Sequence, residues 1–170
     1  ESILNVTNLV FIDAMGTGDS TMGGKGTPAW ADAGVICPWT IYETYGDKRM
    51  LERHLPAMTK WVEFMRQHSN QLIRDGDRGS DYGDWLSINA NTPKALIGTA
   101  FFAYSTHLLA ESYRAVGRDE QAQKYQSLFD DIKAAFNQRF VKPDGSIEGD
   151  TQCAYAMALK FDLLPENLRA

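Results

Sequence analysis

The chain has 170 residues, enough for one domain that buries roughly 70% of the surface exposed by its unfolded form. A hydrophobic content of 44% excludes a wholly disordered protein. A net charge of −5 argues against nucleic-acid binding, which requires a basic face. No apolar run reaches the ~20 residues of a membrane span, so we expect no membrane contact. The N-terminal residues do not resemble a signal peptide, and the compartment stays open.

Two kinds of helical pattern alternate along the chain. Residues 31–45 are apolar around most of the circumference and stop at Gly46, which favours a helix end. The next pattern, 47–67, begins at Asp47, a good N-cap residue, and we expect Pro56 to bend or divide it. Its apolar residues recur at steps of three and four: Leu51, Leu55, Met58, Val62 and Met65.

The alternation then repeats after a long loop, 74–91. Residues 93–116 are apolar or small nearly all round, with Thr92 as the expected N-cap, and they stop at Gly117. Residues 119–140 again carry a single stripe: Ala122, Tyr125, Phe129, Ile132, Phe136 and Phe140.

The last complete pattern covers residues 151–161 and is small and apolar on most sides, with Asp150 expected as its cap. A further helix is expected to begin near Pro165. Cys37 and Cys153 fall inside apolar helical patterns and are expected to be buried free thiols.

The order buried, amphipathic, buried, amphipathic, buried predicts an all-α double ring, in which inner and outer helices form antiparallel hairpins. A faint repeat supports this arrangement, because the segments that start at Glu43 and Arg114 share a Gly, a polar start and similar apolar spacing. A helical solenoid is the alternative, although its repeats are shorter than the spacing seen in this chain.

Loop lengths predict where a binding face lies. The turns at Gly46 and Gly117 are tight, whereas the connections 13–28, 74–91 and 142–149 are longer. In alternating antiparallel helices the longer loops all emerge at one end. Because sites usually occupy irregular loops on a rigid scaffold, we expect the binding face at that end.

Two tryptophans fall on this predicted face, Trp30 in PAWADAG and Trp85 in YGDWLSIN. An indole in a polar, glycine-rich loop can stack on the apolar C–H face of a sugar, and the alternative is that it anchors its loop. Trp39 and Trp61 lie within helical stripes and are expected in the core.

Acidic residues also gather near this face. They are Asp32, Asp75, Asp77, Asp81, Asp84, Glu148 and Asp150. Asp84 with Glu148, or with Asp150, is a candidate acid and base for glycoside hydrolysis, which needs two carboxylates. Asp32, Asp81 and Asp84 could instead bind sugar hydroxyls or cap turns. We expect no metal site and no cofactor, since the acidic spacing does not fit an EF-hand and no nucleotide-binding motif occurs.

The order of five motifs is specific. WADA, PWTIYETYGD, GDWL, TP followed by AYSTHLLAE, and TQCAYAMAL occur in this sequence between about Pro28 and Ala170. In this order they resemble the central part of bacterial α-L-rhamnosidases of glycoside hydrolase family 78. The resemblance implies a partial (α/α)6 catalytic domain over 1–170, with helical hairpins in 28–170 and a poorly matched segment in 1–27.

The resemblance also implies inverting hydrolysis of terminal α-L-rhamnose, with rhamnose-containing glycosides or polysaccharides as substrates. Trp30 and Trp85 match tryptophans that line the family's rhamnose pocket. The family's general acid belongs to a motif of the form DxxxRDERxGWxGD, which residues 1–29 do not contain, and its base is expected beyond Ala170. The chain would then be an inactive fragment with a sugar-stacking wall, prone to self-association. A non-catalytic helical binding or scaffold module, or another (α/α)6 carbohydrate-active enzyme, is the alternative.

Overall fold

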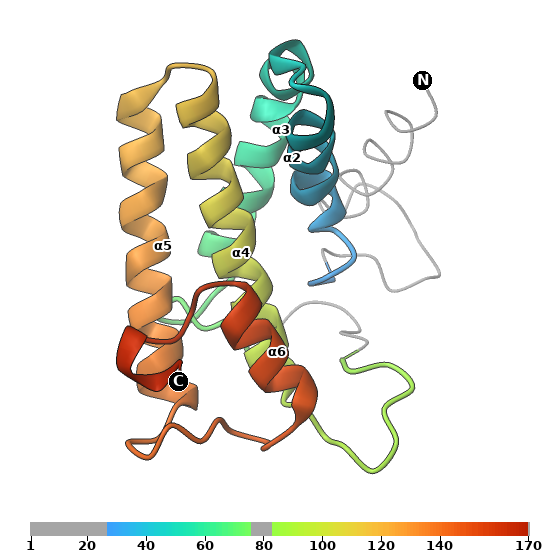
Figure 1. Ribbon diagram of the computed structural model, residues 1–170, viewed down its shortest axis with the longest axis vertical. Coiled ribbons are helices and arrows are strands. Elements are labelled where there is room, and N and C mark those ends of the chain that lie inside the picture. The colour runs from blue at the N-terminus through green and yellow to red at the C-terminus, as the bar shows by residue number, and fades with distance from the viewer. Residues whose placement is uncertain (1–26, 76–82, 170) are drawn as a thin grey trace.

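A computed structural model describes residues 27–75 and 83–169, and within these ranges the chain is helical (Figure 1). The helices in chain order are α2 (Ala33–Tyr45), α3 (Lys48–Gln67), α4 (Lys94–Ala115), α5 (Asp119–Phe140), α6 (Gln152–Lys160) and the short 3-10 helix η1 (Glu166–Leu168). Extended pairing among the described residues is limited to two isolated bridges, Asn70–Ile73 and Val141–Ile147. None of the helices described is long and apolar enough to cross a membrane.

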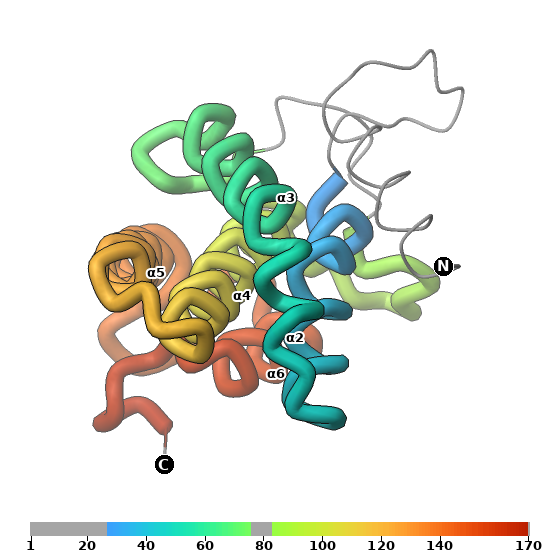
Figure 2. Tube along the Cα trace, turned by 90° about the horizontal axis from the view of Figure 1, so that it is seen from above, coloured from blue at the N-terminus to red at the C-terminus, as the bar shows by residue number. Residues whose placement is uncertain are grey.

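The predicted hairpins are present. Helices α2 and α3 form one antiparallel pair, closed at Gly46, and α4 and α5 form another, closed at Gly117 (Figure 1). Both glycines adopt a left-handed backbone, with φ of 69° and 76°, which permits these short turns. Helix α4 contacts α2, α3, α5 and α6, and it lies between the other helices when the molecule is viewed along the bundle (Figure 2).

The stripes predicted for the two amphipathic helices are confirmed. All five stripe residues of α3 and all six of α5 are buried. Helix α4 buries 14 of its 22 residues, as expected for an inner helix surrounded by protein. The core therefore lies where α3 and α5 cover α4, as their hydrophobic spacing predicts.

Helices α2 and α6 are apolar, but each is covered by the rest of the described protein on only one side. In α2 the buried residues are Gly34, Val35 and Pro38, and Tyr45 is 78% exposed. Cys37 is exposed and Cys153 is half-buried, so the expected burial of both thiols is wrong. The face of α2 that holds Cys37 has no described neighbour to cover it. Trp61 lies in the core, whereas Trp39 is only half-buried at its edge.

Several helix ends differ from the sequence prediction. Helix α3 continues through Pro56, so the expected division is absent. Thr92 does not cap α4, whose N-cap is Pro93. The N-cap of α6 is Thr151, whose hydroxyl accepts a hydrogen bond from the N–H of Ala154, and Asp150 is therefore not the cap. The helix expected after Pro165 is the single 3-10 turn η1.

The longer connections all leave the helices at the ends that point away from the two glycine turns (Figure 1). Their described parts are 27–32, 68–75, 83–93 and 141–151. The prediction that these loops share one end is thus confirmed for the described residues. Asp77, Asp81 and most of the loop 13–28 lie outside them.

Candidate functional site

The two tryptophans predicted to form a site lie side by side. The ring centroids of Trp30 and Trp85 are 6.1 Å apart, and their planes are inclined by 43°. The side chains are 58% and 59% exposed, so both present indole surface to solvent. Trp30 comes from the turn before α2 and Trp85 from the loop before α4, so tertiary packing brings together two distant parts of the sequence.

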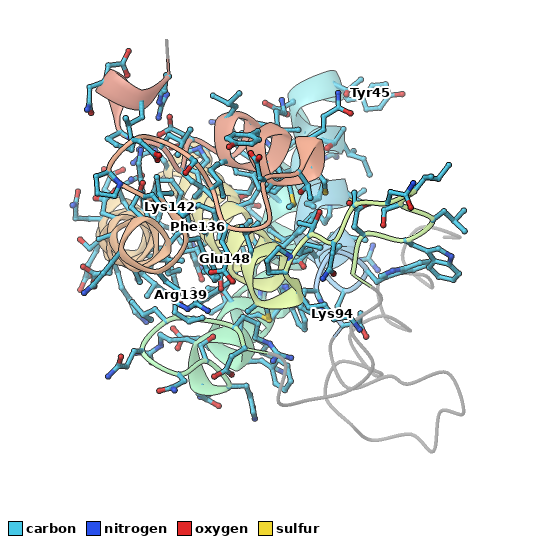
Figure 3. The ribbon with its side chains drawn as sticks, turned by 90° about the horizontal axis from the view of Figure 1, so that it is seen from below. Tyr45, Lys94, Phe136, Arg139, Lys142 and Glu148 are labelled. Atoms are coloured by element: carbon cyan, nitrogen blue, oxygen red, sulfur yellow. The ribbon has the colours of Figure 1, made fainter. Side chains whose placement is uncertain are left out.

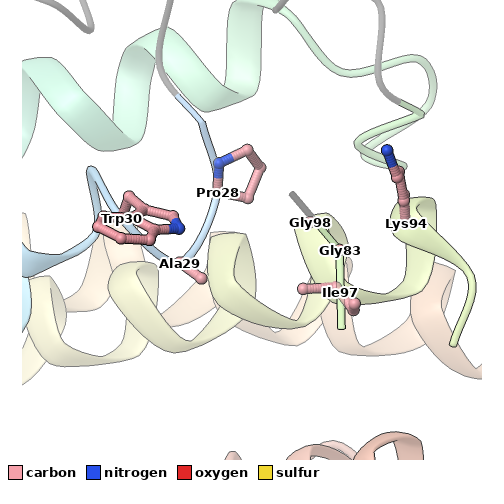
Figure 4. Close-up of a pocket in the computed structure, with 7 residues that line it drawn as sticks. All are labelled: Pro28, Ala29, Trp30, Gly83, Lys94, Ile97 and Gly98. Atoms are coloured by element: carbon pink, nitrogen blue, oxygen red, sulfur yellow. The ribbon is translucent and has the colours of Figure 1, made fainter. Parts of the chain in front are cut away.

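A small pocket adjoins Trp30 (Figure 4). It is lined by Pro28, Ala29, Trp30, Gly83, Lys94, Ile97 and Gly98. Its cavity volume of about 20 Å³ suits a water-sized group. Lys94 lies exposed at the first turn of α4 and supplies the cationic side chain of the lining. Sequence reasoning did not identify Lys94, because a lysine at a helix start reads as a solvated surface residue.

The turn that carries Trp30 is held by backbone and side-chain hydrogen bonds. The N–H of Ala31 donates to the carbonyl of Thr27 at 3.0 Å. The N–H of Ala29 donates to Oδ2 of Asp32 at 2.8 Å. Ala29 has a φ of 71°, a left-handed conformation that is unfavourable for a residue with a Cβ. The turn therefore depends on these contacts to keep its shape.

Asp32, a candidate for sugar binding in the sequence, has no exposed surface. Its Oδ1 accepts a hydrogen bond from Nε1 of Trp61 at 2.8 Å and another from the hydroxyl of Ser105. Burial raises the pKa of Asp32 to about 6, although its hydrogen bonds oppose this rise. The carboxylate thus connects the turn before α2 to α3 and α4. Its predicted contact with a sugar stays untested, and its contacts in the structure are internal.

Asp84 belongs to a second network. Its Oδ2 accepts a hydrogen bond from the hydroxyl of Thr92 at 2.9 Å, and the Thr92 hydroxyl lies 2.7 Å from that of Thr151. The thiol of Cys153 is close by, and its pKa is raised by partial burial and then by the charge of Asp84. This network joins the loop of Trp85 to the start of α6. The sequence predicts Thr92 as a helix cap and Thr151 as the first residue of a helix, and neither prediction indicates their tertiary contact.

Glu148 is engaged elsewhere. It forms an ion pair with Arg139 of α5 (Figure 3). The guanidinium of Arg139 lies 5.0 Å from the ring centre of Phe140. The backbone N–H of Glu148 donates to the carbonyl of Phe140 at 2.8 Å. The two candidate carboxylates, Asp84 and Glu148, therefore belong to separate networks, and their role as acid and base stays a prediction.

The described residues contain no cluster of three or more His, Cys, Asp or Glu that could hold a metal ion. Of the other acidic candidates, Asp150 accepts a hydrogen bond from the hydroxyl of Tyr155 at 2.8 Å. Around Trp30 and Trp85, the described part of this face offers aromatic surface, the side chain of Lys94, and the carboxylates of Asp32 and Asp84, which are hydrogen-bonded within the protein. That combination suits the binding of a small polar ligand with an apolar face.

The chain matches a family model described as the bacterial α-L-rhamnosidase six-hairpin glycosidase domain over residues 15–170. It is 42% identical over 146 residues to an α-L-rhamnosidase of Streptomyces avermitilis, and the aligned region covers 86% of this chain and 14% of that protein. It is 34% identical over 158 residues to an α-L-rhamnosidase of Formosa agariphila, and the aligned region covers 88% of this chain and 17% of that protein.

Solved structures of α-L-rhamnosidases are also similar to this chain. The α-L-rhamnosidase of Streptomyces avermitilis complexed with L-rhamnose superposes with a TM-score of 0.82 at 34% identity, over 99% of this chain and 18% of that one. The α-L-rhamnosidase of Dictyoglumus thermophilum gives a TM-score of 0.75 at 30% identity, over 84% of this chain and 16% of that one. The chain spans less than a fifth of the length of these relatives.

Proposed function

The chain belongs to the bacterial α-L-rhamnosidase six-hairpin glycosidase family, and we propose that it forms one wall of a pocket for a terminal α-L-rhamnose residue. The described helices form part of an (α/α)6 toroid, with α2, α4 and α6 in the inner ring and α3 and α5 outside. Rhamnose release would be the activity of a longer protein, because the related enzymes extend far beyond the matched region.

The observation that carries this proposal is the exposed pair Trp30 and Trp85 on the loop face. A pyranose has an apolar C–H face, and an indole ring covers such a face without requiring a hydrogen bond. Two rings inclined by 43° can contact a sugar from two sides. Lys94 and the polar backbone of the adjoining pocket would then contact hydroxyl groups at the edge of the sugar.

We further propose that the reaction inverts the anomeric centre. Inverting enzymes place a general acid and a general base roughly 6.5–9.5 Å apart, which leaves room for the attacking water. Asp84 is held by Thr92, and Glu148 is paired with Arg139. Because these contacts build the loops, we assign the acid and base to carboxylates outside this chain, and we assign to this chain the stacking wall.

A titration of the purified chain with L-rhamnose tests the binding role. Indole N–H signals in ¹H–¹⁵N NMR would report each tryptophan separately. We expect the signals of Trp30 and Trp85 to shift while that of the buried Trp61 stays in place. Trp30→Ala and Trp85→Ala should each weaken binding about tenfold or more, since each removes a stacking surface worth roughly 1–2 kcal/mol.

Matched controls make the result specific. Trp39→Phe changes a half-buried tryptophan of α2, whose ring lies 5.5 Å from that of Tyr42, and it should leave rhamnose binding intact. L-fucose, a 6-deoxyhexose of different stereochemistry, should bind more weakly than L-rhamnose. Absence of any shift at Trp30 and Trp85 would reject the sugar-stacking role and favour a helical module without sugar binding.

Hydrolysis of a chromogenic α-L-rhamnoside tests where the acid and base lie. We expect no turnover by the folded chain alone. Turnover that is lost in Asp84→Asn or Glu148→Gln would instead place the acid and base within this chain and reject that part of the proposal.

A further inference from the structure

We infer that Asp32 is a positioning residue for rhamnose binding, because it fixes the turn that presents Trp30 next to Trp85. This inference rests on the proposed function of Trp30 and adds a residue that does not itself contact the sugar. Asp32 follows Trp30 by two positions, yet Asp32 has no exposed surface while Trp30 is mostly exposed. A buried carboxylate and an exposed indole thus belong to the same short turn.

The contacts of Asp32 reach three parts of the fold. Oδ2 accepts the N–H of Ala29 within the turn, at 2.8 Å. Oδ1 accepts the indole N–H of Trp61 from α3, at 2.8 Å, and the hydroxyl of Ser105 from α4. Helix α4 is the central and most buried helix of the described bundle. The contact with Ser105 therefore fixes the position of the turn relative to the core.

The chemistry of these donors calls for a carboxylate. The N–H groups of Ala29 and Trp61 can only donate, and they approach opposite oxygens of Asp32. An asparagine offers one carbonyl oxygen and one NH₂ group, so in either orientation its NH₂ would face a donor. Asn at position 32 would therefore keep the contact to the turn or the contact to α3, but not both.

Loss of the Ala29 contact would act on Trp30 directly. Ala29 holds a left-handed backbone, with φ of 71°, which a residue with a Cβ adopts only when its surroundings impose it. Without the acceptor at Asp32, the residue would relax towards ordinary φ values. Trp30 follows Ala29 in the chain, so its ring would leave the position 6.1 Å from Trp85.

The test compares a substitution of Asp32 itself with substitutions of the residues that donate to its Oδ1 atom. Asp32→Ala should weaken L-rhamnose binding about tenfold and lower the heteronuclear NOE of the Trp30 indole, as expected when a hydrogen bond to a charged group is lost. Trp61→Phe and Ser105→Ala remove donors from Oδ1 and leave the Ala29 contact in place. They should lower the unfolding temperature but keep the Trp30 signal and the rhamnose affinity.

A purely structural role would make affinity fall in step with stability in all these variants, and that result would overturn the inference. An ordered Trp30 and unchanged affinity in folded Asp32→Ala would overturn it as well. Amide exchange of the unaltered chain needs no variant: we expect slow exchange at Ala29, and exchange at the rate of an open loop would contradict the inference. If the unaltered chain does not bind rhamnose, the proposed function fails, while the order of Trp30 still decides the role of Asp32.

Discussion

The hydroxyl groups of Thr92 and Thr151 lie 2.7 Å apart although 59 residues separate them in the sequence. Thr92 also donates to Asp84, which directly precedes Trp85, and Thr151 caps the N-terminus of α6. Through this pair of buried side chains, the loop before α4 and the start of α6 are joined at the loop face. Their substitution therefore tests how that face is assembled.

Thr92→Val should lower the free energy of unfolding by about 1–3 kcal/mol, because the change keeps the side-chain shape but removes contacts to Asp84 and Thr151 in a buried position. Thr151→Val should have at least as large an effect, because the cap to Ala154 is lost as well. Urea denaturation followed by circular dichroism measures both. Thr44→Val, on the exposed side of α2, is the matched control and should change stability little. Equal stability of all three variants would show that the pair contributes nothing.

Asp32 should make the chain less stable as the pH rises from about 4 to 7. Burial raises its pKa in the folded state to about 6 from a reference value of 3.8. A raised pKa means that the folded state binds a proton more tightly than the unfolded state. The stabilisation is complete below the unfolded pKa and is lost as the pH rises through the folded pKa. The loss amounts to roughly 3 kcal/mol.

Unfolding free energies of the unaltered chain and of Asp32→Asn, measured at several pH values, isolate this contribution. As the pH increases, the free energy of unfolding of the unaltered chain should fall relative to that of Asp32→Asn. Glu63→Gln serves as a control of opposite sign. Burial raises the pKa of Glu63, but hydrogen bonds from Lys124, Arg66 and Tyr125 outweigh it, so the net pKa is lowered. A constant difference between Asp32→Asn and the unaltered chain would contradict the shifted pKa.

Gly98→Ala should destabilise the fold although alanine is the better helix former. An added Cβ would lie 3.0 Å from Cγ and 3.1 Å from the carbonyl oxygen of Arg74, which is fully buried and whose N–H donates to Thr99. The crowding should outweigh the helix propensity of about 1 kcal/mol and leave a net loss of about 1–2 kcal/mol. Thermal unfolding measures it. Gly46→Ala isolates the effect of a left-handed backbone, since its Cβ would meet no atom within 4 Å. A stabilised Gly98→Ala would mean that Arg74 moves aside easily.

The purified chain should self-associate. Helices α2 and α6 leave apolar surface exposed, including Tyr45 at 78% and Leu159 at 51%, and such surface rarely stays bare. Sedimentation velocity at several concentrations should show species larger than the monomer. Tyr45→Lys and Leu159→Lys should shift the distribution towards the monomer, whereas Lys48→Ala, at the exposed start of α3, should not. A single monomeric species at all concentrations would contradict this expectation.

The structural properties that could be predicted from the sequence are those determined by residues close together in the chain. The presence of α2 to α6, the stripes of α3 and α5 and the turns at Gly46 and Gly117 were predicted correctly, because apolar spacing and backbone preference act between near neighbours. The gathering of the loops at one end followed from the alternation of those helices. The placement of Trp30 and Trp85 on one face followed in turn, since each belongs to a loop that precedes an inner helix, whereas their separation of 6.1 Å was decided by packing.

Tertiary structure decided what each loop side chain does. Nothing local distinguishes the buried Asp32 from the exposed Trp30, because the partners of Asp32 are Trp61 and Ser105, 29 and 73 residues further along the chain. The exposure of Cys37 likewise depends on which face of α2 finds a neighbour. Periodicity tells which residues share a face of a helix. Which face is covered, and which polar group meets a distant partner there, is decided only when the helices pack.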